Sequence, residues 1–332
     1  MDFGLLVYDD FPQYGGQNIG DYIQSLAAKQ FIKNRDVIYV NRDHLNNYEG
    51  KKIKLVMNGW FSHIPENFPP NSNIIPLFVA FHLNSTIKDR FLTNQVIEYL
   101  KKFEPIGCRD KYTVSVLKEK GIDAYFSGCL TLTLGKKYKT LEKNDNVYIV
   151  DPFIGLDFSF PSIIRIIRTL LLKNKFVHRL QKEMFNKVTL KTAIKSSLFI
   201  NQYSKVWGYD FLTKANYIHH MFTCNSYDEY FLKADELIKK YAAAKLVITS
   251  RIHVALPCTG LETPVIFVNA ANDTQLSTCR FDGLIDLFNI LNHNGVELLN
   301  DGNIDLISPN INSTYKIIVS QLIKKCEAFA SE

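Results

Sequence analysis

A pair of short apolar runs, separated by a helix-length segment, constrains the fold of this chain most strongly. Residues 246–248 and 265–268 are apolar and include β-branched side chains, which is typical of buried strands. The small-residue segment between them is long enough for a short helix. The sequence therefore predicts a β-α-β unit, in which the two strands lie parallel in one sheet.

The same order of strand and helix recurs along most of the chain. Strands are expected at residues 3–8, 37–40, 53–57, 74–81, 105–108, 122–126, 147–150 and 215–221. Helices are expected to begin at Asn18 and to cover residues 85–103, 110–120, 226–244 and 313–329. This alternation predicts an α/β fold with largely parallel sheets and right-handed crossovers.

The length of the chain predicts two domains. It has 332 residues, and residues 136–146 have the polar, lysine-rich composition of a linker. We therefore expect an N-terminal domain over residues 1–140 and a C-terminal domain over residues 141–332. No apolar stretch approaches the roughly 18 residues of a spanning helix, and no basic region precedes the first apolar run. Together with six cysteines that form no paired motif, these features predict a cytoplasmic protein.

The net charge of +6 is concentrated in one segment. Residues 161–195 hold nine lysines and arginines and one acidic residue, a local charge of +8 that leaves −2 for the rest of the chain. This local distribution argues against nucleic acid as a partner. No metal is expected either, because His219 and His220 are adjacent, so that their side chains diverge, and no metal-ligand spacing surrounds them.

Polar residues follow the first strand of the β-α-β unit, where the helix begins. Ser250, Arg251 and His253 fall at the carboxyl edge of the predicted sheet, where ligands bind in open α/β folds. A helix N-terminus and Arg251 both offer donors to an anion, and His253 can carry a proton near neutral pH. The cluster predicts a site for a small anion with a proton transfer. The alternative is that Arg251 makes a structural salt bridge and His253 only starts the helix.

The end of the first strand carries a second group of candidates. Asn18 is placed to cap a helix, Gly20 permits close approach of a neighbour, and Asp21 suits a first helical turn. These residues either form only a capped helix or also, with the glycine-bearing loop at residues 9–17, the floor of a site.

Arg109 stands at a third strand end. It follows the expected strand at residues 105–108, so it also falls on the edge where ligands bind. The structural alternative is a surface salt bridge with Asp110 or Glu119.

Four short motifs occur in an order that resembles one family. They are N-x-G-D at residues 18–21, G-C-R-D at 107–110, S-R-x-H at 250–253 and R-F-x-G-L at 280–284. In order and spacing they resemble the polysaccharide pyruvyl transferases, over roughly residues 3–290. The resemblance implies a GT-B-like architecture, in which two Rossmann-like domains face each other across a cleft. It further implies that residues 1–140 form the acceptor side and residues 141–332 the donor side.

The resemblance also implies roles for individual residues. His253 matches the catalytic position of the family, and we expect Asp21 to act with it. The residues expected to bind substrate are Arg251, Arg109, Ser250, Asn18, Gly20 and Arg280. The chain departs from the family pattern after an early strand, where a glycine-rich turn is usual and this chain has only Asn58, Gly59 and Trp60.

The chemistry implied by the family agrees with these residue types. Phosphoenolpyruvate carries a carboxylate and a phosphate, which Arg251, Arg109 and a helix N-terminus could bind. Setting its pyruvyl group as a cyclic ketal on two sugar hydroxyls requires an acid for the enol carbon, and His253 is the best candidate. Asp21 would orient or deprotonate the acceptor hydroxyl. The donor is a substrate, and no cofactor is expected.

Two other functions fit parts of the same pattern. A GT-B glycosyltransferase with a nucleotide-sugar donor could use the same architecture and an arginine near the phosphates. A non-catalytic module that binds sugar phosphates would not need a titratable group beside the anion, so His253 argues against it.

The basic segment allows two interpretations. Its isoleucines and leucines at residues 163–172 are interrupted by Arg165 and Arg168 and are followed by Lys173 and Lys175. A helix with an apolar face and cationic edges suits the surface of an anionic membrane, where a lipid-linked saccharide acceptor would be found. The protein would then be peripheral at the inner face of the membrane. A core helix of the second domain fits the same periodicity equally well.

Overall fold

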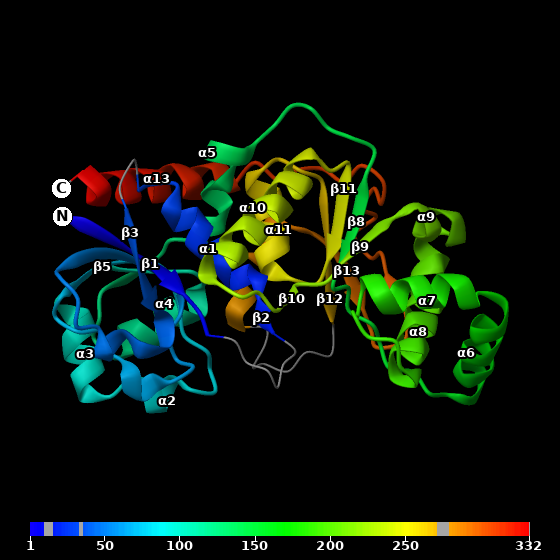
Figure 1. The fold of residues 1–332 in the computed structure, drawn as a ribbon, viewed down its shortest axis with the longest axis horizontal. Coiled ribbons are helices and arrows are strands. Elements are labelled where there is room, and N and C mark those ends of the chain that lie inside the picture. The colour runs from blue at the N-terminus through cyan, green and yellow to red at the C-terminus, as the bar shows by residue number, and fades with distance from the viewer. Residues whose placement is uncertain (10–15, 33–35, 271–278, 332) are drawn as a thin grey trace.

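The computed structural model describes residues 1–9, 16–32, 36–270 and 279–331, with Arg280 described by its backbone alone. Two six-stranded sheets dominate it, and Figure 1 shows them side by side with a group of helices beyond the second sheet. Neighbouring strands are parallel in both sheets except for one pair at an edge. The predicted α/β fold with parallel sheets is confirmed. Among the described residues, no helix is long and apolar enough to cross a membrane.

The first sheet uses the N-terminal part of the chain and has the strand order β3-β1-β4-β5-β6-β7. Its strands are β1 (Asp2–Val7), β3 (Val37–Asn41), β4 (Ile53–Trp60), β5 (Ile74–His82), β6 (Ile106–Cys108) and β7 (Ala124–Phe126). The helices that connect them are α1 (Ile19–Lys29), α2 (Lys88–Phe91), α3 (Asn94–Lys101) and α4 (Lys111–Glu119). Each of these strands matches an expected one to within a few residues.

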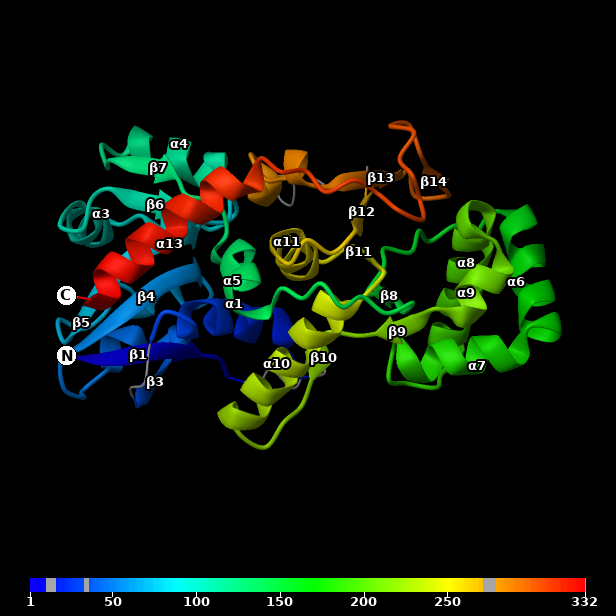
Figure 2. The same cartoon turned by 90° about the horizontal axis from the view of Figure 1, so that it is seen from above.

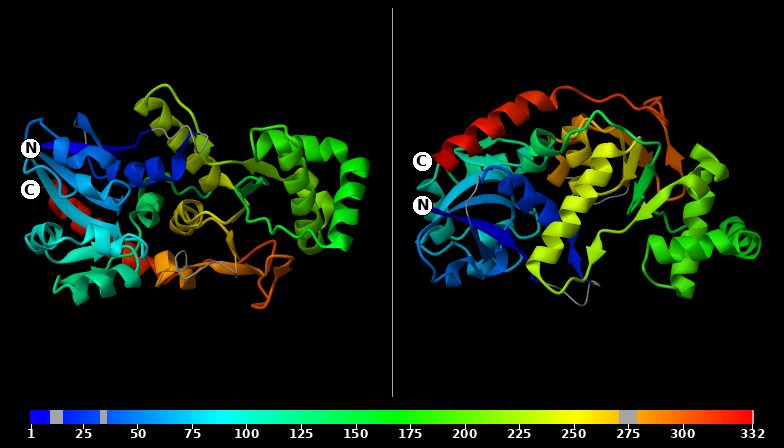
Figure 3. Two further views of the ribbon diagram at one scale, coloured as in Figure 1. Left: turned by 90° about the horizontal axis from the view of Figure 1, so that it is seen from below. Right: turned by 45° about the horizontal axis from the view of Figure 1, so that its top comes forward.

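The second sheet has the order β14-β13-β12-β11-β8-β9, and only β13 and β14 are antiparallel. Its strands are β8 (Val147–Val150), β9 (Asn216–Ile218), β11 (Leu246–Thr249), β12 (Val265–Ala270), β13 (Asn289–His293) and β14 (Leu298–Leu299). The predicted β-α-β unit is present as β11, α11 (Ile252–Gly260) and β12. Helix α10 (Tyr227–Ala243) precedes it and lies against α1, as Figure 3 shows.

Four helices follow β8 and form a group outside the second sheet. They are α6 (Phe160–Leu172), α7 (Asn174–Glu183), α8 (Leu190–Trp207) and α9 (Tyr209–Lys214). Aromatic side chains of α7 and α8 pack with Tyr217 of β9, which attaches the group to the sheet edge. The basic segment at residues 161–195 therefore spans α6, α7 and the start of α8.

The chain ends against the first sheet. Helix α13 (Tyr315–Ser331) crosses back over that sheet, and Figure 2 shows it above β4 to β7. The ring of Phe329 meets the ring of Phe3 edge to face, and Lys54 Nζ donates to the Phe329 carbonyl at 2.9 Å. The C-terminal segment thus contributes to the packing of the N-terminal sheet. The domain division at residue 140 stays a prediction.

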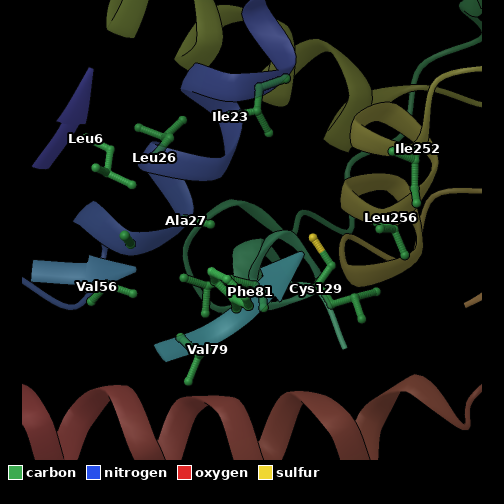
Figure 4. Close-up of a cluster of buried hydrophobic side chains, with 14 of the residues drawn as sticks. Leu6, Ile23, Leu26, Ala27, Val56, Val79, Phe81, Cys129, Ile252 and Leu256 are labelled. Atoms are coloured by element: carbon green, nitrogen blue, oxygen red, sulfur yellow. The ribbon is translucent and has the colours of Figure 1, made fainter. Parts of the chain in front are cut away.

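One hydrophobic core runs between the two sheets. Ile23, Leu26 and Ala27 of α1 face the strands of the first sheet, and Ile252 and Leu256 of α11 belong to the same buried cluster (Figure 4). A short antiparallel pair between β2 (Gln17–Asn18) and β10 (Met221–Phe222) adds a backbone connection. Because α1 and α11 share this core, their N-termini are held in fixed positions relative to each other.

Several local expectations need correction. The single helix expected over residues 85–103 is two helices, because the backbone of Thr93 is extended and its side chain caps α3 by accepting from Val96 N. The expected strand over 215–221 divides into β9 and β10. The expected linker begins with a short helix, α5 (Gly135–Tyr138).

The remaining short helices are of the 3-10 type. They are η2 (Arg42–Asn47), η3 (Pro65–Asn67), η4 (Leu130–Leu134), η5 (Cys279–Phe281) and η6 (Ile285–Leu287).

Candidate functional site

A pocket of about 540 Å³ lies where the carboxyl ends of strands from both sheets meet. Strands β4, β5 and β6 of the first sheet, and β8, β9 and β11 of the second, all end at or near residues that line it. This is the edge at which ligands bind in α/β folds. Six of the eight residues predicted from sequence line it, namely Asn18, Asp21, Arg109, Ser250, Arg251 and His253.

The beginning of α11 forms the wall on the second-sheet side. Arg251 is the N-cap residue of this helix, and its Nε donates to Asp151 Oδ2 at 2.9 Å. Among the described residues, the guanidinium bonds to Asp151 through Nε, so the two Nη groups remain available to an anion. The Arg251 side chain is 41% exposed, which gives a ligand access to it. Arg251 therefore makes the salt bridge that the structural alternative predicted. The same side chain also lines the pocket and can still donate hydrogen bonds there.

Sequence reasoning missed Asp151, which organises this wall. It follows β8 directly and has a left-handed backbone, with φ of 38°. Its Oδ2 accepts from the His220 backbone N–H at 3.1 Å as well as from Arg251 Nε. The signal available in the sequence was an acidic residue at the end of a predicted strand.

Ser250 has a structural role. Its hydroxyl donates to the Val268 carbonyl at 2.8 Å and accepts from the Phe153 backbone N–H at 2.7 Å. These two bonds join the loop after β8 to β12. Ser250 was predicted to bind substrate, and here its hydroxyl fixes the loop that carries other lining residues.

Helix α1 approaches α11 closely at Gly20. A Cβ atom on Gly20 would lie 3.1 Å from His253 Cβ, tighter than ordinary contact. The predicted close approach is therefore to His253, and a side chain at position 20 would require His253 or Asn18 to shift by a few tenths of an ångström. Asn18 caps α1 as predicted, with its Oδ1 accepting from Gly20 N at 3.1 Å.

Asp21 is an acidic group held in a network. Its carboxylate accepts from Gln17 Nε2 at 3.1 Å and from Gln24 Nε2 at 3.2 Å, and Arg42 Nη1 lies 3.9 Å away. Burial raises the pKa of Asp21 above its ordinary value, and the charges of Arg42 and Arg109 oppose this rise without cancelling it. A carboxyl group with a raised pKa is suited to exchanging a proton with a ligand.

Arg109 forms the floor of the pocket on the first-sheet side. Its backbone N–H donates to the Phe81 carbonyl at 2.8 Å, which places the residue beside the end of β5. The side chain is only 5% exposed, and its Nε lies 3.8 Å from Asp110 Oδ2. This Nε is buried and has no hydrogen-bond partner among the described residues. The salt bridge with Asp110 that the structural alternative proposed is therefore present, but it is buried rather than at the surface. The Arg109 Nε can still donate a hydrogen bond to an anion.

A histidine–aspartate pair lies beside Arg109 and was not predicted. His82 Nδ1 is 2.6 Å from Asp110 Oδ2, while Asp110 Oδ1 accepts from the backbone N–H and the hydroxyl of Thr113 at 2.8 Å each. Burial would raise the pKa of Asp110, but the hydrogen bond from His82 and the charges of His82 and Arg109 outweigh it and hold that pKa below its ordinary value. An ionised Asp110 can only accept, so Nδ1 of His82 carries a proton and donates to Asp110 Oδ2.

His220 lines the pocket as a neutral, structural group. It is fully buried, its Nε2 lies 2.7 Å from the Tyr241 hydroxyl, and its carbonyl accepts from Ile19 N at 2.8 Å. Burial, with the charge of Arg251, lowers the pKa of His220 to about 3. The residue connects β9 to the N-terminus of α1.

The residues that depart from the family pattern, Asn58, Gly59 and Trp60, form the end of strand β4 rather than a turn, and this strand end reaches the pocket. Trp60, at the end of β4, lines it, and Asn58 Nδ2 donates to the Gln24 carbonyl at 2.9 Å. Gly59 has φ of 129°, a conformation that favours glycine. The end of β4 is therefore fixed to α1 and supplies an aromatic wall to the pocket.

Two expectations fall partly outside the described residues. Arg280 lies in η5, and nothing is described of its side chain. Residues 10–15 of the loop expected to form the floor are also outside the described part.

Comparisons with known proteins identify the family. Residues 18–272 match the family model of polysaccharide pyruvyl transferase. No curated protein matches the chain.

Comparison with solved structures finds weak likenesses, which extend over most of the chain. A protein of uncharacterised function from Klebsiella pneumoniae is 15% identical, over 85% of this chain and 88% of its own, with a TM-score of 0.44. The E. coli heptosyltransferase WaaC with ADP is 11% identical over 98% and 100%, with a TM-score of 0.26. TM-scores below 0.5 do not establish a common fold. The family match covers most of the chain and spans three of the four motifs, and the chain belongs to the polysaccharide pyruvyl transferase family.

Proposed function

We propose that this protein transfers the pyruvyl group of phosphoenolpyruvate to two hydroxyls of a sugar in a polysaccharide or its precursor, forming a cyclic ketal. The observation that carries the proposal is the pocket, which combines two arginines, a helix N-terminus and several titratable groups. We also propose a GT-B-like division of labour, in which residues 1–140 present the acceptor and residues 141–332 present the donor, with Arg109 of the first part completing the donor site.

The donor has two anionic groups, and the pocket has two cationic positions. Arg251 offers its Nη groups, and the N-terminus of α11 adds the positive end of the helix dipole, which together suit a phosphate. Arg109 offers a buried donor, which suits the carboxylate. A donor bound in this way would span the pocket and set its enol carbon beside the start of α11.

The reaction balances without a cofactor. His253 gives a proton to the methylene carbon of the enol, which becomes the methyl group and leaves positive charge on the central carbon. The first sugar hydroxyl attacks that carbon and loses its proton to a base. The bond from the central carbon to the phosphate oxygen then breaks, the second hydroxyl attacks in its place, and its proton leaves with inorganic phosphate. A positioned acid of this kind contributes a factor of about 10² to 10⁴.

We propose that two groups on the first-sheet side serve the acceptor. Asp21, with its raised pKa, can take the proton of the attacking hydroxyl. His82 lines the pocket and is oriented by Asp110 in the way that a buried carboxylate orients a catalytic imidazole. Trp60 adds an apolar face against which a sugar ring can pack.

The test is incubation of the protein with phosphoenolpyruvate and a panel of galactose-type and mannose-type acceptors. We expect release of inorganic phosphate and an acceptor whose mass has increased by one pyruvyl ketal. The Arg251→Ala variant serves as the control for donor binding. Release of nucleotide from a nucleotide sugar, with no reaction of phosphoenolpyruvate, would overturn the proposal in favour of glycosyl transfer.

A further inference from the structure

Helix α6 exposes the apolar side of its surface. Its large hydrophobic residues lie at the spacing of one helical face, and Phe160 and Leu171 are 75% and 73% exposed. Figures 1 and 2 place α6 at the outer edge of the molecule, in the group of helices beyond the second sheet. The exposed residues are Phe160, Ile163, Ile164, Ile167, Leu171 and Leu172.

The side of α6 that packs against the protein is less apolar than the side that faces outward. Its buried residues are Ser162, Ile166 and Thr169, and the Thr169 hydroxyl donates to Asn201 Oδ1 of α8 at 2.9 Å. A helix of a folded core normally buries its apolar stripe. The expectation of a core helix is therefore wrong for the apolar face of α6, and a contiguous apolar surface of this kind marks an interaction site.

The segment that contains this apolar face is strongly basic. Residues 161–195 carry +8, with Glu183 as the one acidic residue. Arg168 and Lys175 are exposed, whereas Arg165 is 3.7 Å from Asp157 and Lys173 lies 4.0 Å over the ring of Tyr209. An occupant of the apolar face would thus meet an excess of cations at its edge.

We propose that α6 binds the surface of an anionic lipid bilayer, with its axis in the plane of the membrane. An apolar face flanked by lysine and arginine is the pattern of interfacial helices, whose apolar side enters the acyl boundary while the cations meet lipid headgroups. The helix has 13 residues, about 20 Å, which is too short to span a bilayer and sufficient to lie on one.

The loop before α6 connects this surface to the pocket. Ile154 lines the pocket, and Leu156 and Phe158, two and four residues later, are exposed. Four extended residues reach at most about 14 Å. Bound through α6, the protein would hold its pocket near the headgroup layer, where a lipid-linked saccharide is found; this last step rests on the proposed function.

The binding surface can be tested without the enzymatic reaction. The full chain is sedimented with vesicles of 30% phosphatidylserine and 70% phosphatidylcholine, and with pure phosphatidylcholine, over a range of salt concentrations. We expect binding to the anionic vesicles that weakens with salt. The triple variant Ile164→Ser, Ile167→Ser and Leu171→Ser should lose binding, and Arg168→Glu should weaken it by about 30-fold, because it changes the charge by two.

Matched variants separate this surface from general effects. Ile317→Ser on α13 removes an exposed apolar side chain, and Lys52→Glu reverses an exposed charge before β4; both should bind vesicles like the wild type. Circular dichroism should show the triple variant folded, since its three changes are at exposed positions.

No binding to anionic vesicles at low salt would overturn the proposal. So would a dimer in lipid-free solution that the triple variant dissociates, because a second copy would then cover the face. Neither result depends on phosphoenolpyruvate chemistry, so failure of the membrane proposal would leave the proposed pyruvyl transfer untouched.

Discussion

The two walls of the pocket hold their charged groups in different ways. On the first-sheet side, Arg109, His82 and Asp110 are almost fully buried and contact one another. On the second-sheet side, Arg251 is partly exposed and its guanidinium is held by Asp151 through Nε. One wall is a fixed network whose members depend on each other, and the other presents a single cation at a helix start.

This difference predicts different consequences of mutation. A change in the buried network alters the pKa values and the stability of its neighbours, because charges interact strongly where water is excluded. A change at the exposed helix start removes one contact to a ligand and leaves the fold intact. The comparison therefore separates residues that act directly on the donor from residues that act through others.

The largest effect is expected at His253. Replacement by Ala should lower turnover by about 10² to 10⁴ while the affinity for phosphoenolpyruvate changes little, because a proton donor acts in the transition state. Phosphate release measured over a range of donor concentrations separates the two quantities. His253→Gln is the matched variant, since it keeps polar bulk without a transferable proton, and near-normal turnover in it would show that another group is the acid.

The variants Arg251→Ala and Arg109→Ala should differ in their effect on the melting temperature. Arg251→Ala should raise the KM for phosphoenolpyruvate by roughly 10- to 150-fold, the effect of losing one charged hydrogen-bonding group, and should leave the melting temperature unchanged. Arg109→Ala should raise KM and also lower the melting temperature, because Asp110 loses a buried counter-charge. Equal melting temperatures for the two variants would contradict the contrast between the walls. Arg251→Lys keeps the charge and should show an intermediate KM.

The two carboxylates of the first-sheet wall should respond to pH in opposite directions. The pKa of Asp110 is lowered in the folded state, so its contribution to stability is present above the unfolded pKa of about 3.9 and is lost as pH falls through the folded pKa. The pKa of Asp21 is raised, so its ionised form costs stability as pH rises above about 3.9 and through the folded pKa.

Urea unfolding of Asp110→Asn and Asp21→Asn, each against the wild type, measures both contributions. Between pH 3.5 and pH 7, Asp110→Asn should become less stable relative to the wild type. Asp21→Asn should become more stable over the same range. If the stability of both variants relative to the wild type changed in the same direction with pH, the opposite pKa shifts of Asp110 and Asp21 would be contradicted.

A smaller effect is expected at Gly20. A methyl group there would press on His253 from 3.1 Å, so Gly20→Ala should reduce turnover by several-fold at about the same stability. Gly302→Ala is a suitable control, because its Cβ would meet Ile304 at an ordinary 3.7 Å. Unchanged turnover in Gly20→Ala would show that the imidazole position is not set by this contact.

The elements and their order could be predicted because they depend on local patterns. Apolar β-branched runs gave the strands, Asn18 supplied the cap of α1, and Gly121, with φ of 71°, ended α4 as predicted. The strand ends then indicated Arg109 and Arg251, because parallel strands end at one edge.

The partners of these residues could not be predicted, since they depend on tertiary contacts. His82 and Asp110 lie 28 positions apart, and Arg251 and Asp151 lie 100 apart. Their pairing follows from neighbouring strands that place both ends together, as β5 beside β6 and β8 beside β11. The outward direction of the apolar face of α6 was undecided for the same reason, because periodicity fixes a face and packing decides what it meets.

The central claim is that this pocket protonates the enol carbon of phosphoenolpyruvate and transfers the pyruvyl group to a sugar. The most direct measurement is mass spectrometry of the product formed in D₂O. We predict a pyruvyl ketal whose methyl group carries one deuterium, with one inorganic phosphate released per ketal, and loss of this product in His253→Ala. A ketal whose methyl group carries no deuterium, or phosphate release with no ketal on any acceptor of the panel, would contradict the account.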